Sequence, residues 1–152
     1  MLRNMTTLPA KILLCCLLLV LAGCDDDDDE KTSLNKVQFK NIALTGAQEV
    51  PANSSQATGT FNGTYNRNTK VLTYTLTYDG ITPTAMHFHK EAIGQSGGVE
   101  VPIGSTPYSS PVTGQTPVLT QDQEADLLAG DWYVNIHSSQ FPAGEIRGQL
   151  TR

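Results

Sequence analysis

Apolar and polar residues alternate with a period of two along much of the chain. The clearest run is 71–78, where Leu72, Tyr74 and Leu76 share one face and threonines take most of the other. Successive side chains of a β-strand point to opposite faces, so this run predicts a half-buried strand. Similar runs that end at turn residues predict further strands at 37–40, 59–65, 86–89, 99–103, 132–137 and 144–150.

Two segments break this alternation. Residues 104–117 are rich in Ser, Thr, Pro and Gly and predict a loop. Residues 120–128 predict one short helix, because Thr120 and Gln123 form a capping box and Gly130 suits the C-terminal end. Many short strands in one domain-sized segment, 37–152, favour an all-β fold, a small antiparallel β-sandwich with Greek-key-like connections and this one helix.

The N-terminal segment has a different character. After a positively charged start, residues 12–22 form an apolar run. This run is too short for a membrane-spanning helix, which needs about 20 residues, but has the proportions of a secretory signal core. Leu21-Ala22-Gly23-Cys24 resembles the bacterial lipobox, which implies removal of residues 1–23 and palmitate-type lipidation of Cys24. The alternative is an ordinary signal peptide with an incidental cysteine.

An acidic block follows, with five aspartates at 25–29 and then Glu30. Dense like charges repel one another and bury nothing, so residues 24–36 predict a disordered tether. Without residues 1–23 the chain has 8 Lys and Arg against 15 Asp and Glu, a net charge of −7. This balance excludes a basic nucleic-acid-binding surface.

The same acidic block bears on localisation. Acids just after a lipidated cysteine resemble a surface-display signal in some Gram-negative bacteria, and in others they resemble an inner-membrane retention signal. A plain spacer is the third interpretation. We expect the protein in the cell envelope, lipid-anchored outside the cytoplasm, with the outer membrane or cell surface favoured over the inner membrane.

Several reactive groups are absent from the predicted domain. Cys15 and Cys16 lie in the signal core and Cys24 is the anchor site, so residues 37–152 contain no cysteine. This excludes a disulfide, a thiolate metal site and a cysteine nucleophile there. Gly94-Gln95-Ser96-Gly97-Gly98 has the spacing Gly-x-Ser-x-Gly, but it lies between two predicted strands. A nucleophile elbow needs a strand-to-helix turn, so this segment predicts a turn and not an elbow or a phosphate-binding loop, and we do not expect an enzyme.

The chain has three histidines, His87, His89 and His137. Two residues apart in a strand, His87 and His89 point to one face, and Met86 and Phe88 point to the other, which is the expected core side.

The same rule applies to the last two predicted strands. It places Asn135 and His137 opposite the apolar set of 132–136, and Glu145 and Arg147 opposite Ile146. If these strands are neighbours, the polar residues cluster, and three imidazoles can bind Zn²⁺ or Cu²⁺. Asn135, Glu145 and Arg147 would then lie outside the ligand set and support the ligand rings. Glu145, for example, could orient one imidazole.

A simpler interpretation stays open. The histidines line a solvated polar face and hydrogen-bond to Asn135, Glu145 and each other. Glu145 and Arg147 form a surface ion pair or clamp a neighbouring loop.

Four motifs together resemble the CHRD domain, first described in chordin and also found in bacterial exported proteins. In the family's order, they are Leu44–Pro51, Met86–His89 with the following Gly94 and Gly97, Tyr133–Ser138, and Gly144–Gln149. The resemblance covers about 41–150. Glu91 and Ala143 stand where the family usually has glycine, so the adjacent turns can differ.

The resemblance implies a β-sandwich that binds rather than catalyses. We therefore expect a membrane-anchored, non-catalytic binding or adhesion module with a protein or glycan ligand. The alternative is a Zn- or Cu-binding protein with a redox-related role. The His-x-His strand is similar to the copper-binding strand of Cu/Zn superoxide dismutase. A dismutase would be expected to have a fourth copper histidine and a zinc site, and this chain has three histidines in all.

Overall fold

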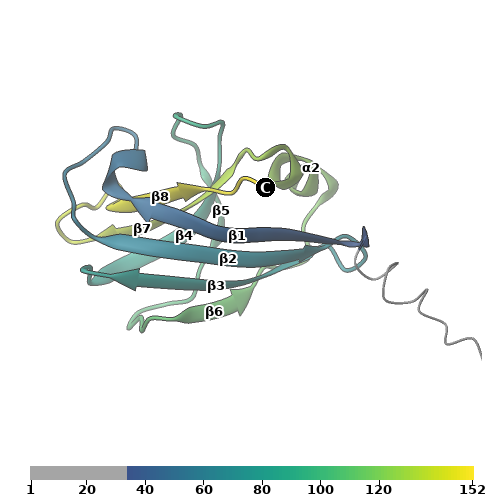
Figure 1. Cartoon of the computed structure of the whole chain (residues 1–152), viewed down its shortest axis with the longest axis horizontal. Coiled ribbons are helices and arrows are strands. Elements are labelled where there is room, and N and C mark those ends of the chain that lie inside the picture. The colour runs from purple at the N-terminus through teal and green to yellow at the C-terminus, as the bar shows by residue number, and fades with distance from the viewer. Residues whose placement is uncertain (1–33) are drawn as a thin grey trace, which may run out of the picture.

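The computed structural model describes residues 34–152 (Figure 1). Its strands are β1 (Lys36–Thr45), β2 (Thr58–Asn66), β3 (Val71–Asp79), β4 (Pro83–Lys90), β5 (Val99–Pro102), β6 (Val112–Gln115), β7 (Trp132–Ser138) and β8 (Ile146–Gln149). A 3-10 turn, η1 (Gly46–Gln48), follows β1, and the helix α2 (Gln121–Ala129) precedes β7. The all-β class with one short α-helix is confirmed for this part of the chain.

Some predictions concern residues that are not described. The signal peptide, Cys24 and the acidic block up to Glu30 lie outside residues 34–152. Within that range, no helix is both long enough and apolar enough to cross a membrane.

The strands pair antiparallel in one curled sheet with the order β5-β4-β7-β8-β1-β2-β3-β6. β8 and β1 share the single residue pair Thr45–Arg147, and the two halves of the sheet meet at this seam. The halves face each other as two layers (Figure 1). Phe88 of β4 contacts Phe61 of β2 and Tyr74 of β3, with ring centroids 5.7 and 5.2 Å apart.

The core lies between these layers and follows the predicted alternation. Met86 and Phe88 are fully buried, as are Trp132, Val134 and Ile136. Aromatic side chains bring large apolar areas, and those in this core meet mostly edge to face or tilted. The apolar faces predicted for 86–89 and 132–137 are therefore confirmed.

The helix begins and ends where the capping residues predict. The Thr120 side chain accepts a hydrogen bond from the Gln123 backbone, and the Gln123 side chain accepts one from the Thr120 backbone. Gly130 ends the helix with φ of 88°, a left-handed conformation that glycine adopts without steric cost.

The predicted loop at 104–117 is wrong in part, because it contains β6. This strand pairs with β3 at the sheet edge, from Val112–Leu76 to Gln115–Thr73. Its side chains are half-buried or exposed, so its sequence lacks the apolar alternation that reveals the other strands. At the opposite edge lies β5, within the predicted strand at 99–103.

β1 connects the two ends of the sandwich. β1 begins at Lys36 at one end, on the right in Figure 1, and runs to the other, where it continues into segment 46–57. The turn after β7, at 139–145, lies at that second end beside segment 46–57, since the Asn53 side chain donates to the carbonyls of Gly144 and Glu145.

Candidate functional site

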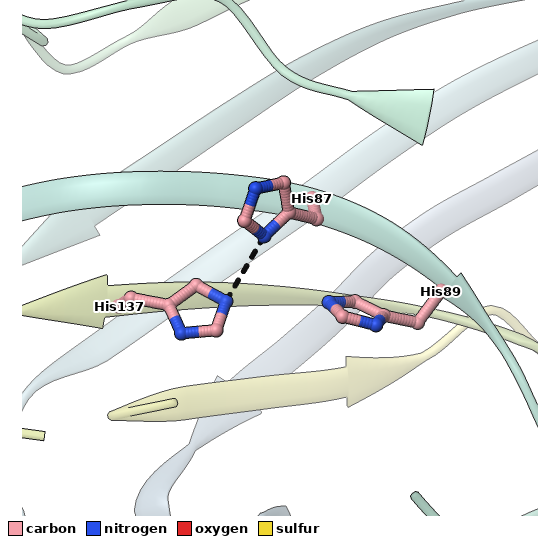
Figure 2. Close-up of side chains that lie close together, drawn as sticks. All are labelled: His87, His89 and His137. Carbon is pink, nitrogen blue, oxygen red and sulfur yellow. Dashed lines mark hydrogen bonds between the residues drawn. The ribbon is translucent and has the colours of Figure 1, made fainter. Parts of the chain in front are cut away.

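The three histidines converge on the outer face of the sheet half that contains β4 and β7. These strands are neighbours, with His87 opposite Asn135 and Ala85 opposite His137, so the predicted adjacency is confirmed. Figure 2 shows the three rings close together. One nitrogen from each ring lies within 4.8 Å of the other two, and His87 Nδ1 is 3.1 Å from His137 Nε2.

Two backbone carbonyls fix the tautomers of His89 and His137. His89 Nδ1 lies 3.2 Å from the Gly97 carbonyl, and His137 Nδ1 lies 3.0 Å from the Pro142 carbonyl. Because a carbonyl only accepts hydrogen bonds, both Nδ1 atoms carry the hydrogen and both Nε2 atoms are acceptors. The Nε2 lone pair of His89 is free, whereas that of His137 accepts a hydrogen bond from His87 Nδ1. Histidine ligands of metals show this arrangement, one nitrogen held by a carbonyl and the other facing the ion.

The Nε2 atom of His89 has an unmet bonding capacity. It is buried and has no hydrogen-bond partner among the residues that the structure describes. A buried polar atom without a partner is costly, so such atoms need an explanation. An ion bound between the three rings would supply the missing partner.

The spacing is compatible with a transition metal. Zinc–imidazole bonds are about 2.0–2.1 Å long, so neighbouring ligand atoms of a tetrahedral ion lie roughly 3.4 Å apart. The His87–His137 separation is already close to this value, and the widest separation, at most 4.8 Å, needs to shorten by no more than about 1.4 Å.

Electrostatics keeps the rings neutral. Burial lowers the pKa of all three histidines below the ordinary value, and for His87 the nearby His137 and His89 lower the pKa further. Burial disfavours the charged form of an imidazole, so near neutral pH the rings are in the neutral form that a metal ion requires.

The polar residues beside the histidines are not solvated, contrary to the simpler interpretation of the sequence. Tyr133, Asn135, Glu145 and Arg147 are all buried, and Arg147 is 2% exposed. Hydrogen bonds from two loops, 49–57 and 91–98, bring these segments over the outer face. We call these four residues, together with Glu49, the polar layer.

Arg147 clamps one of these loops and is not a surface residue. It donates to the Gln95 carbonyl at 2.8 Å and to the Gln149 side chain at 2.9 Å. Its guanidinium lies 3.4 Å from the centroid of the Tyr133 ring, which stacks on His89 at 4.8 Å and 4°. Arg147 therefore supports a candidate ligand ring through Tyr133.

Glu145 holds a neighbouring loop, which is one of the roles that the sequence left open, and it does not orient an imidazole. Its carboxylate accepts a hydrogen bond from Ser55 at 2.7 Å, which ties loop 49–57 to the sheet. The imidazoles of His89 and His137 are oriented by backbone carbonyls instead. A surface ion pair between Glu145 and Arg147 was also expected, but both side chains are buried under the loops.

Glu49 was not identified from the sequence. It is 8% exposed, and burial raises the pKa of its carboxyl group while Arg147 opposes that rise. Glycines are the signal that could have revealed the covered face. A side chain at Gly97 would overlap the Lys90 carbonyl, and one at Gly144, where φ is 137°, would meet Glu49 and Asn135.

Comparison with known proteins gives one finding. The family model described as CHRD domain matches residues 41–150, a range that contains all three histidines and both covering loops. No curated protein and no solved structure matches the chain.

Proposed function

Because the chain belongs to the CHRD domain family, we propose that it is a non-catalytic binding or adhesion module held outside the cytoplasm. The observation that carries the proposal is the polar layer, whose side chains hold loops in place. Ser55, for example, donates to Glu145 and accepts from the Ala57 backbone, so its hydroxyl is engaged structurally and has no histidine base. Loops held on a rigid sheet are common sites of recognition.

The N-terminal sequence supports the location. A lipobox-like Leu21–Cys24 and the acidic block after it favour a lipid anchor at Cys24, in the outer membrane or on the cell surface. Stable anchoring generally needs more than one acyl chain, which a lipidated N-terminal cysteine can carry. The ligand is then a protein or glycan outside the cell.

The anchor is tested by labelling cells with radioactive palmitate. Wild type and the matched control Cys15→Ala should carry label and partition into the membrane fraction. Cys24→Ala should lose the label, because the acceptor thiol is gone. Label retained on Cys24→Ala would contradict the anchor.

The binding role is tested with the full-length protein in detergent, probed on arrays of glycans and extracellular proteins. We expect saturable binding with the ligand recovered unchanged. Conversion of a ligand to product at a rate abolished by one substitution in the polar layer would show an enzyme instead.

One observation favours a second candidate function, the binding of Zn²⁺ or Cu²⁺. The Nε2 atoms of His89 and His137 carry no hydrogen, and one ring nitrogen of each of the three histidines lies within 4.8 Å of the others. Imidazole is a good ligand for both ions. Asn135 and Arg147 would stabilise this site from outside the ligand set, through the polar layer.

Metal content by mass spectrometry tests this candidate. The full-length protein is purified without a histidine tag, beside the triple variant His87→Ala/His89→Ala/His137→Ala. Gln38→Ala, on the outer face of the other sheet half, is the control. We expect near-stoichiometric metal in wild type and control and none in the triple variant. Equal metal in all three would contradict the site.

A further inference from the structure

The candidate metal site offers three protein ligands. Within residues 34–152, the group that could hold the ion comprises His87, His89 and His137, without a carboxylate or thiolate. Zinc sites with three protein ligands keep a fourth position for water or another molecule. Resting on the metal-binding candidate, we propose that this fourth position is open to the outside and takes a carboxylate oxygen of a ligand.

Burial shows from which side a ligand can approach. His89 is buried, whereas His87 and His137 are partly exposed. The inner side is closed, because the His89 ring stacks on Tyr133 and Arg147 lies against Tyr133. A fourth donor therefore reaches the ion from the side of His87 and His137.

Side chains of the polar layer are poorly placed to fill the position from within. The Glu145 carboxylate is engaged by Ser55, and the Gln149 amide oxygen accepts from Arg147. The rival is Asn135 Oδ1, which is buried and has no hydrogen-bond partner in the described part of the chain. The experiment below separates this rival from an external ligand.

Charge favours a carboxylate over a neutral donor. Three neutral imidazoles leave both positive charges of a divalent ion uncompensated, and zinc accepts carboxylate oxygens at about 2.0–2.2 Å. The carboxylate can come from a small organic acid or from an acidic side chain of a protein partner. Both sources present the same oxygen donor to the ion.

The test uses the full-length protein in detergent, loaded with Co²⁺, whose visible absorption bands respond to a change of ligand. It is titrated with acetate, with imidazole, and with a short peptide that has one central aspartate and blocked ends. Asn135→Ala is titrated in parallel, and the triple histidine variant sets the background.

We expect acetate and the peptide to shift the cobalt bands saturably in wild type and in Asn135→Ala. A peptide that binds at least tenfold more tightly than acetate indicates a protein partner, and equal affinity indicates a small acid. Bands that no titrant moves in wild type overturn the open position, as does a shift seen only in Asn135→Ala. A shift with imidazole alone overturns the carboxylate.

Failure of the proposed function has a separate signature. Protein that takes up no cobalt, zinc or copper overturns the metal-binding candidate, and this inference falls with it. Uptake with bands insensitive to every titrant leaves the metal site standing and removes only the open position.

Discussion

The two faces of the sheet half formed by β4, β7 and β8 are both buried, yet they are built in opposite ways. On the inner face Trp132, Val134 and Ile136 pack into the apolar core. On the outer face Tyr133 and Asn135 are just as inaccessible, at 3% and 2% exposure. Alternation along β7 therefore separates apolar from polar surroundings, and does not separate buried from exposed.

The difference teaches where directional interactions matter. Apolar burial is roughly proportional to the area removed from water and has no direction. A buried polar group costs free energy unless its hydrogen bonds are made, so the outer face depends on particular partners such as Gln95 for Arg147. The inner face should tolerate changes of similar shape, and the outer face should not.

The largest effect should come from the inner face. Trp132→Ala should lower the free energy of unfolding by about 3–5 kcal/mol, because it removes a fully buried ring and leaves a cavity. Urea denaturation measures this loss. Trp132→Phe, which keeps a ring in the core, should lose clearly less, and equal losses for the two variants would argue against shape-tolerant packing.

The second-largest loss of stability should come from removing the Arg147 clamp on the outer face. Arg147→Ala should cost about 2–3 kcal/mol, because the Gln95 carbonyl and the Gln149 side chain lose a charged donor. Limited proteolysis should then cut loop 91–98 faster. Arg147→Lys should not restore stability, since an ammonium cannot reproduce the planar fork that stacks on Tyr133. A lysine variant as stable as wild type would refute the directional clamp.

A smaller contrast lies within the histidine cluster. His89→Ala should cost about 1–2 kcal/mol, because it removes a buried ring that is bonded to Gly97 and stacked on Tyr133. His87→Ala, at a partly exposed position, should change stability by no more than about 0.5 kcal/mol. Chemical denaturation of the metal-free variants measures both losses of stability. A larger loss for His87→Ala than for His89→Ala would contradict the difference in burial.

The smallest effect should appear in the pH dependence of stability. Burial raises the pKa of Glu49 above its unfolded value of 4.5, so the folded protein holds its proton to higher pH. The resulting stabilisation is complete below pH 4.5 and is lost as pH rises through the folded pKa. Glu49→Gln lacks this titration, so wild type should lose stability relative to the variant as pH rises from 4.5. If the stabilities of wild type and Glu49→Gln changed equally with pH, that result would contradict a raised pKa for Glu49.

Much of the fold was predictable because it depends on local signals. Alternation gave the faces of 86–89 and 132–137, and Thr120, Gln123 and Gly130 gave the helix ends. β6 was missed because an edge strand paired on one side needs few apolar residues.

The candidate site was predictable only in part. The shared face of the three histidines follows from spacing, but the burial of the polar layer does not. It depends on contacts between distant segments, such as Ser55 with Glu145 and Arg147 with Gln95. No local pattern encodes such contacts, although the glycines at 97 and 144 mark where the backbone comes close.

The direction of β1 sets how the site would be presented. This ten-residue strand spans roughly 33 Å, and the chain enters it at the end of the sandwich opposite the 139–145 turn, which adjoins His137. An anchor at Cys24, as proposed, would hold the molecule by its far end. The histidines would then lie away from the protein's own membrane and face the surrounding medium. A neighbouring surface would meet this end of the molecule first.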